Sequence, residues 1–183
     1  QRFMASMEDA SDRVAQLKKI LNADYPRFSG MDIPVEIVNS VTLSTMHGCP
    51  PDEIEEISRY LMEERHLHTY VKLNPTLLGK EEVLEILHDR LGYREISIPD
   101  DVFDHDLHYD RAIELITSLR EVAEEQGLSF GVKLSNTLAM SNHRDVLPGD
   151  EMYMSGRALY PITMSLFQKL SRLFDGDLNV SYS

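Results

Sequence analysis

Two stretches of the chain place a lysine inside an apolar run and polar residues directly after it. They are Val71-Lys72-Leu73-Asn74-Pro75-Thr76-Leu77 and Val132-Lys133-Leu134-Ser135-Asn136-Thr137-Leu138. Because strand side chains alternate, each lysine points opposite to its valine and leucine neighbours. A lysine directed into a protein interior needs an anion, a carboxylate or a ligand, since an unpaired buried charge is costly. Lys72 and Lys133 are therefore candidate ligand-binding residues. The alternative is that each reaches solvent or pairs with an acidic neighbour.

A second concentration of chemistry lies in the segment 42–51, which joins a predicted strand to a predicted helix. Cys49 would lie just ahead of the helix N-terminus, where the helix dipole favours a thiolate suited to act as a base or nucleophile. His47 is close enough in sequence to assist it. The alternative is a buried structural cysteine beside a hydrogen-bonding histidine.

Cys49 is the single cysteine of the chain. One cysteine excludes an internal disulfide and any complete cysteine-ligated zinc or iron–sulfur site within these residues. We predict no metal site, because the Asp- and His-rich segment 100–110 matches no metal-ligand spacing and is expected to be a solvated loop. The long polar connection 136–156 is expected to be a lid, a binding loop or a disordered segment.

Alternating strands and helices are predicted to position these residues. Short β-branched or alternating runs predict five strands, at Val38–Thr45, Thr69–Asn74, Arg94–Ile98, Ser129–Ser135 and Leu178–Tyr182. Apolar residues at helical spacing predict helices at Ser6–Leu21, Pro51–Glu64, Gly79–Leu91, Tyr109–Gln126 and Leu159–Phe174. Such alternation with short connections is typical of parallel strands joined by right-handed crossovers.

The predicted fold class is α/β, a partial (β/α)8 TIM-type barrel with about five parallel strands. A dinucleotide-binding sheet is disfavoured, because no glycine-rich turn follows the first strand. A complete barrel needs about eight strands and about 250 residues, whereas this chain has 183 and ends directly after a strand. We therefore expect an N-terminal helical segment, 1–37, followed by an incomplete barrel, 38–183, with exposed sheet edges that could support homo-oligomers.

The composition limits the partners. The formal charge of −13 argues against nucleic acid and against anionic membranes, both of which would repel the chain. No run is long and apolar enough for a membrane span, and the start lacks a signal-peptide pattern. Together with the single cysteine, this predicts a cytoplasmic protein. The acidic composition names no substrate.

Several of these segments resemble a known flavin barrel. Ser135-Asn136-Thr137 resembles the Thr-Asn-Thr strand end of dihydroorotate and dihydropyrimidine dehydrogenases, and Lys72-Leu73-Asn74-Pro75 resembles their K-(hydrophobic)-x-P strand. The run 154–162 is similar to their S-G-x-A-(hydrophobic)-x-P helix entry, and 178–183 to the strand before their phosphate loop. From Val41 onward the chain more closely resembles the putative selenate reductase subunit family, large flavin- and iron–sulfur-containing oxidoreductases.

The resemblance implies roles for particular residues. It makes Asn136 and Thr137 flavin or substrate contacts, Gly156 a backbone approach to the flavin, and Lys72 a partner for the electron-rich side of the isoalloxazine. The catalytic cysteine of the dehydrogenase N-L-S-C loop falls on Thr45, with Cys49 four residues later, so that either residue, or neither, acts as the proton donor. The predicted strand Arg94–Ile98 separates two strands that are consecutive in those enzymes, which by counting would give the flavin-facing role to Lys133.

The sequence thus predicts a fragment of a flavin-dependent oxidoreductase, with hydride or electron transfer at FMN in the full-length protein. The barrel resemblance implies a small-molecule substrate. FMN is expected to bind weakly or not at all to this chain, because the phosphate-binding loops are absent from it. The resemblance implies iron–sulfur clusters and FAD or NAD(P) in other redox domains or subunits. Two alternatives stay open: a Schiff-base lyase of aldolase type using Lys72 or Lys133, and a non-catalytic structural barrel module between redox domains.

Overall fold

A computed structural model describes residues 9–28, 30–36, 38–44, 49–145 and 147–182. The chain divides into two compact units, Gln1–Val41 and Thr42–Ser183. The first unit contains helix α2 (Ser11–Asp24) and the 3-10 turn η1 (Pro26–Phe28). An extended segment returns along it, where the Ala10 amide donates a hydrogen bond of 2.8 Å to the Val35 carbonyl.

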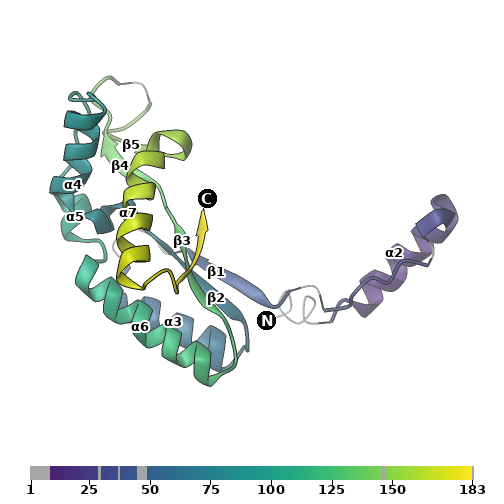
Figure 1. The fold of residues 1–183 in the computed structure, drawn as a ribbon. Helices are drawn as coiled ribbons and strands as arrows, with labels where there is room; N and C mark the ends of the chain where they lie inside the picture. The colour runs from purple at the N-terminus through teal and green to yellow at the C-terminus, as the bar shows by residue number, and fades with distance from the viewer. Residues whose placement is uncertain (1–8, 29, 37, 45–48, 146, 183) are drawn as a thin grey trace. The chain divides into compact units, whose positions relative to one another are not determined.

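The second unit is built on a four-stranded sheet whose strand order is β1-β2-β3-β6. The strands are β1 (Ser40–Ser44), β2 (His68–Leu73), β3 (Phe130–Leu134) and β6 (Asn179–Tyr182). β2 pairs with β3 in parallel, and β3 pairs with β6 in parallel. Within the described residues, β1 and β6 form the two edges. This open sheet with crossover helices confirms the predicted partial barrel (Figure 1).

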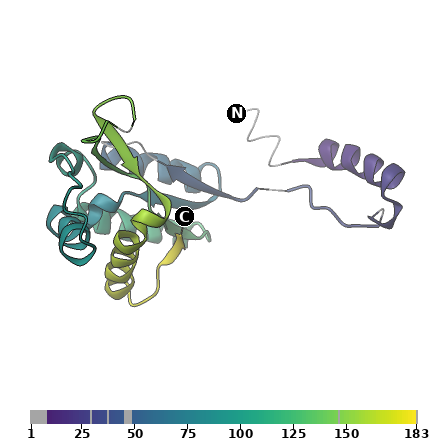
Figure 2. The same ribbon diagram turned by 90° about the horizontal axis from the view of Figure 1, so that it is seen from above.

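Helices cover one face of this sheet (Figures 1 and 2). The longest are α3 (Pro51–Glu63), α6 (Tyr109–Glu125) and α7 (Tyr160–Leu173). The shorter elements are η2 (Pro75–Leu78), α4 (Lys80–Leu84), the π-helical η3 (Glu85–Arg90), α5 (Asp101–Asp104) and η4 (Gly156–Leu159). The core between sheet and helices takes Val71 and Leu73 from β2 and Val132 and Leu134 from β3. Alternation therefore directs Lys72 and Lys133 to the opposite face.

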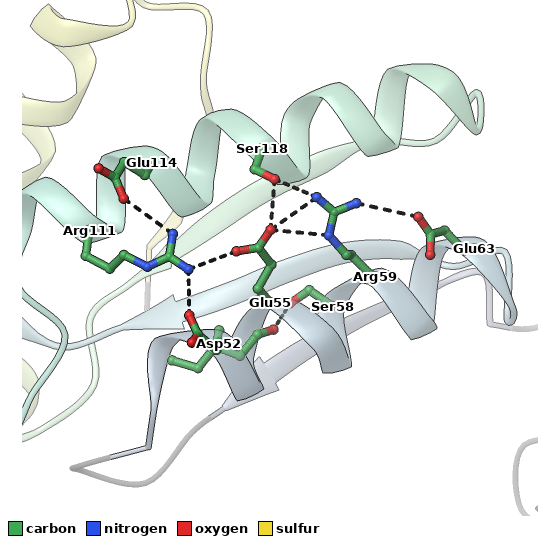
Figure 3. A network of polar contacts seen from close by, with 9 residues as sticks. Asp52, Glu55, Ser58, Arg59, Glu63, Arg111, Glu114 and Ser118 are labelled. Atoms are coloured by element: carbon green, nitrogen blue, oxygen red, sulfur yellow. Dashed lines mark hydrogen bonds and ion pairs between the residues drawn. The ribbon is translucent and has the colours of Figure 1, made fainter.

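A polar network joins α3 to α6 (Figure 3). The Glu55 carboxylate accepts hydrogen bonds from the Ser118 hydroxyl at 2.9 Å and from the guanidinium groups of Arg59 and Arg111, each at 3.1 Å. Partial burial alone would raise the pKa of Glu55, but the donated hydrogen bonds from Ser118, Arg59 and Arg111 outweigh it and lower the pKa. The network therefore links α3 to α6.

The predicted strand Arg94–Ile98 is wrong. The described structure has turn and irregular backbone there, and no ladder pairs with it. Individual hydrogen bonds hold the segment instead: His88 Nε2 lies 2.8 Å from the Ile96 carbonyl, and the Ser97 carbonyl accepts from the Ser141 amide at 2.9 Å. Ile98 is buried in the core, and Ile96 packs against it. The alternating pattern therefore arises because apolar side chains of this irregular connection pack against the core. The sheet consequently has four strands where we predicted five.

The connection 136–156 contains a hairpin that we did not predict. β4 (Leu138–Ser141) and β5 (Glu151–Met154) pair antiparallel at the end of β3. Asn142 closes the loop between them: its side-chain amide donates to the Gly149 carbonyl at 2.7 Å, and its backbone amide donates to the Asp150 carbonyl at 2.8 Å. The described residues of this segment therefore form a β-hairpin, which the polar composition of 136–156 did not indicate.

The other predicted strands and helices are confirmed to within a few residues at their ends. The predicted first helix differs most, since α2 begins at Ser11 and ends at Asp24. Among the residues that the structure describes, none of the helices has both the length and the apolar character needed to span a bilayer.

Candidate functional site

Lys72 and Lys133 are brought together by the register of the sheet. They are direct partners in the β2–β3 pairing, and Ser181 of β6 is the next partner along the same level. Both lysines are half-buried. Neighbouring strands lie about 4.8 Å apart, so two ammonium groups rise from adjacent positions on one face.

Neither lysine has an ion pair with a carboxylate among the described residues. Lys80, by contrast, pairs with Asp100, and Lys169 pairs with Glu82 at 3.5 Å. Pairing with an acidic neighbour is therefore not found in the described part of the chain, whereas the other half of the alternative, in which each half-buried lysine reaches solvent, stays open. Two half-buried positive charges without carboxylate partners among the described residues favour an anionic ligand.

The polar residues after β3 lie at the end of β2. The Asn136 amide donates a hydrogen bond of 2.8 Å to the carbonyl of Leu73, the last residue of β2. Asn136 Oδ1 accepts from the Thr137 amide at 3.0 Å. The Ser135 and Thr163 hydroxyls lie 2.9 Å apart, which ties this strand end to α7. The Ser-Asn-Thr end and the Lys72 strand therefore meet at the carboxyl edge of the sheet, where barrels bind ligands.

Cys49 is half-buried immediately before α3, whose first residue is Pro51. It lines a small pocket together with Lys72, Asn74 and Asp106. Burial, followed by the charge of Glu53, raises the pKa of the Cys49 thiol. This direction is opposite to the lowered pKa that we expected from the helix N-terminus. A neutral thiol suits proton donation better than nucleophilic attack.

The remaining predicted site residues are Thr45, His47 and Gly156. Thr45 and His47 lie outside the described residues. Gly156 begins η4 after β5, and its φ of +59° is in the left-handed region that glycine adopts most readily. The backbone at the start of η4, which leads into α7, therefore favours glycine at this position.

We did not predict a row of three paired residues that precedes the lysines by two positions in each strand. Tyr70 of β2 is the register partner of Gly131 in β3, which in turn partners Asn179 in β6. A Cβ on Gly131 would lie 2.5 Å from Tyr70 Cε1 and 2.6 Å from the Asn179 carbonyl oxygen. The Tyr70 ring therefore lies across Gly131 and forms a floor beneath the lysine pair. Only the pairing of strands distant in sequence shows this contact.

Asp106 was also missed, because the segment 100–110 was expected to be solvated. Its side chain is buried, and its Oδ2 accepts a hydrogen bond of 2.8 Å from the Thr76 hydroxyl. Thr76 lies in η2, directly after the Lys72 strand. Within the described part of the chain, no group of three or more His, Cys, Asp or Glu side chains could hold a metal ion.

Comparisons with known proteins identify the family of the chain. Residues 1–183 match the family model described as "Oxidoreductase YgfK, N-terminal TIM-barrel domain". Two curated relatives, both called "Putative oxidoreductase YgfK", come from Escherichia coli K12 and Escherichia coli O157:H7. Each is 48% identical over 202 residues, an alignment that covers 100% of this chain and 20% of the relative. No solved structure matches the chain.

The chain thus spans about a fifth of the length of these relatives. The match extends over all its residues, and the family description names the barrel architecture that the parallel sheet and its covering helices display. The chain therefore belongs to the family of the N-terminal TIM-barrel domain of the oxidoreductase YgfK.

Proposed function

We propose that this barrel segment forms part of a flavin site in a longer oxidoreductase, with Lys72 beside the electron-rich edge of the flavin. The observation that carries the proposal is the convergence of two strand ends. The Lys72 strand and the Ser-Asn-Thr strand are hydrogen-bonded neighbours, and the Asn136 amide is bonded to the end of β2. The two motifs are therefore consecutive in the sheet, as they are in the dehydrogenases that the chain resembles.

The residues present fit FMN in charge. The strands β1, β2, β3 and β6 contain no aspartate or glutamate within their bounds, although the chain has 31 such residues. Lys72 and Lys133 are the cations of that face without carboxylate partners among the described residues. An ammonium group there stabilises negative charge on a reduced isoalloxazine electrostatically. When bound, the flavin would supply the hydride or electron transfer.

The other residues of the chain have separate tasks in this proposal. Asn136 and Thr137 contact the ring or the substrate at the carboxyl edge of the sheet, and Gly156 allows the backbone to approach it. Cys49, as a neutral half-buried thiol, donates a proton, with Thr45 as the alternative donor. Iron–sulfur clusters and FAD or NAD(P) would belong to other redox domains of the longer polypeptide, or to other subunits.

Flavin content of the full-length protein tests this proposal. Lys72→Met should lower the bound FMN strongly, because it removes the ammonium group and keeps a side chain of similar length. Lys19→Met, at an exposed position of α2, should leave the flavin content unchanged. Wild-type protein without FMN, or FMN retained by the Lys72→Met protein, would favour the non-catalytic barrel module instead.

The adjacency of the two lysines also favours a second candidate, a Schiff-base lyase. A neighbouring cation is one of the arrangements that activate a lysine amine as a nucleophile, and Lys72 and Lys133 are register partners. Borohydride reduction in the presence of a carbonyl compound distinguishes the two. A covalent adduct on either lysine supports the lyase, whereas the flavin proposal expects none.

A further inference from the structure

The proposed flavin function gives a task to Lys72 but none to its neighbour Lys133. One ammonium group suffices to balance the single negative charge of a reduced isoalloxazine. The sheet nevertheless supplies two, because Lys133 is the direct register partner of Lys72. The next partner, Ser181, adds a hydroxyl at the same level. The row of paired residues Lys72, Lys133 and Ser181 therefore carries one more positive charge than the flavin edge requires.

Lys133 has no carboxylate partner among the residues that the structure describes. Its neighbours on that face within β2, β3 and β6 are Tyr70, Lys72, Gly131, Asn179 and Ser181, none of which is acidic. Acidic side chains are frequent elsewhere, since the formal charge of the chain is −13. An anion that joins a half-buried cation without a carboxylate partner stabilises it.

The floor of the site limits where such an anion can lie. The Tyr70 ring fills the space over Gly131, where even a Cβ atom would approach Tyr70 Cε1 to 2.5 Å. The Asn179 side-chain amide is directed to the Phe130 carbonyl at 3.1 Å. A ligand therefore cannot lie deeper than the lysine level, and it meets the two ammonium groups from the carboxyl edge.

We propose that Lys133 binds an anionic group of the substrate, a carboxylate or an oxyanion, next to a flavin edge held by Lys72. The anion site itself does not depend on the proposed flavin function. The assignment of the anion to a substrate rests on that function. The two ammonium groups divide their tasks, and the Ser181 hydroxyl offers the anion a further hydrogen bond. Lys133 is thus a residue that selects an anionic substrate.

Titration of the full-length protein with sodium malonate and, separately, with sodium sulfate tests this inference. Malonate represents carboxylates and sulfate represents oxyanions. The dissociation constant is measured by calorimetry, and flavin content is determined on the same samples. The variants are Lys133→Gln, Lys133→Arg, Lys72→Gln and the control Lys19→Gln, an exposed lysine of α2.

The inference expects at least one probe to bind the wild-type protein. Lys133→Gln should weaken that binding by about tenfold or more, since a hydrogen bond to a charged group is lost, and should leave the flavin content unchanged. Lys133→Arg should retain binding, and the control should match the wild type. Whichever probe binds more tightly identifies the class of anion.

Three results would overturn the inference. The first is a wild-type protein that binds neither probe, and the second is binding that Lys133→Gln does not weaken. In the third, Lys133→Gln loses flavin as Lys72→Gln does, which would assign both lysines to the flavin. A wild-type protein without flavin refutes the proposed function only. In that protein, anion binding that depends on Lys133 still supports the anion site.

Discussion

Lys72 and Lys133, which lie 61 positions apart in the sequence, occupy directly paired positions of two neighbouring parallel strands. Their side chains rise from the face opposite the helix-packed core, without carboxylate partners among the described residues. This relationship removes a conflict between the motif match and the strand count. Because no strand forms at 94–98, the two lysine strands are consecutive, and motif and topology agree.

The Glu55 network predicts a pH-dependent contribution to stability. Glu55→Gln should lower the free energy of unfolding at neutral pH by about 1–3 kcal/mol, because charge-assisted hydrogen bonds from Arg59, Arg111 and Ser118 are weakened. The pKa of Glu55 is lowered in the folded state. Its contribution is therefore complete above the unfolded pKa of about 4.3 and is lost as the pH falls through the folded value.

Denaturant unfolding as a function of pH measures this effect. The difference between wild type and Glu55→Gln should shrink as the medium becomes more acidic than about pH 4. Glu63→Gln is the control, because its contact with Arg59 is longer, 3.6 Å, and its side chain is 43% exposed. A difference that is the same in acid and at neutral pH would show that the ionised Glu55 does not stabilise the helix pair.

Gly131→Ala should destabilise the sheet. The added Cβ would lie 2.6 Å from the Asn179 carbonyl oxygen, a backbone atom that cannot move aside without shifting β6. Overpacking of this kind costs about 1–3 kcal/mol, and thermal unfolding measures it. Gly30→Ala is the matched control, since nothing lies within 4 Å of its added Cβ. Equal melting temperatures for the two variants would mean that the Tyr70 floor is not held as described.

The Cys49 thiol should react slowly with iodoacetamide at neutral pH. Burial and Glu53 raise its pKa, so the reactive thiolate is a smaller fraction than in an exposed cysteine. The rate, followed by mass spectrometry of the peptide that contains Cys49, should increase as the pH rises. Glu53→Gln should speed the reaction at a given pH, whereas Glu64→Gln, at the far end of α3, should not. Fast alkylation of the wild type at neutral pH would instead indicate an activated nucleophile.

The bond between Thr76 and Asp106 should couple the end of β2 to the segment after α5. Thr76→Val and Asp106→Asn, alone and combined, form a double-mutant cycle on a buried hydrogen bond of 2.8 Å. The coupling free energy should be about 0.5–3 kcal/mol. Thr117→Val, which changes an exposed hydroxyl bonded only within its helix at 2.8 Å, should show no coupling to Asp106→Asn. Strict additivity of Thr76→Val and Asp106→Asn would contradict the contact.

The sequence was sufficient for the features that depend on local pattern. Period-two alternation located β2 and β3, and helical spacing with glycine or proline boundaries located α3, α6 and α7. The direction of Lys72 and Lys133 also followed, because alternation fixes which side of a strand each residue faces.

Features that depend on tertiary pairing could not be predicted in this way. Alternation at 94–98 resembles a strand, yet a ladder requires a neighbouring strand, and hydrogen bonds from His88 and Ser141 hold that segment instead. The pairing of Lys72 with Lys133, the Tyr70 floor and the burial of Asp106 all join residues distant in sequence. No periodicity within one segment contains that information.

The most direct test of the central claim is an experimental structure of the full-length protein with its flavin. The proposal predicts an FMN isoalloxazine on the face of Lys72 and Lys133, with the Lys72 ammonium within hydrogen-bond distance of the electron-rich edge of the ring. Asn136 should lie beside the ring at the carboxyl end of β2. A structure in which this face is filled by protein side chains, with flavin bound only in another domain, would contradict the proposal.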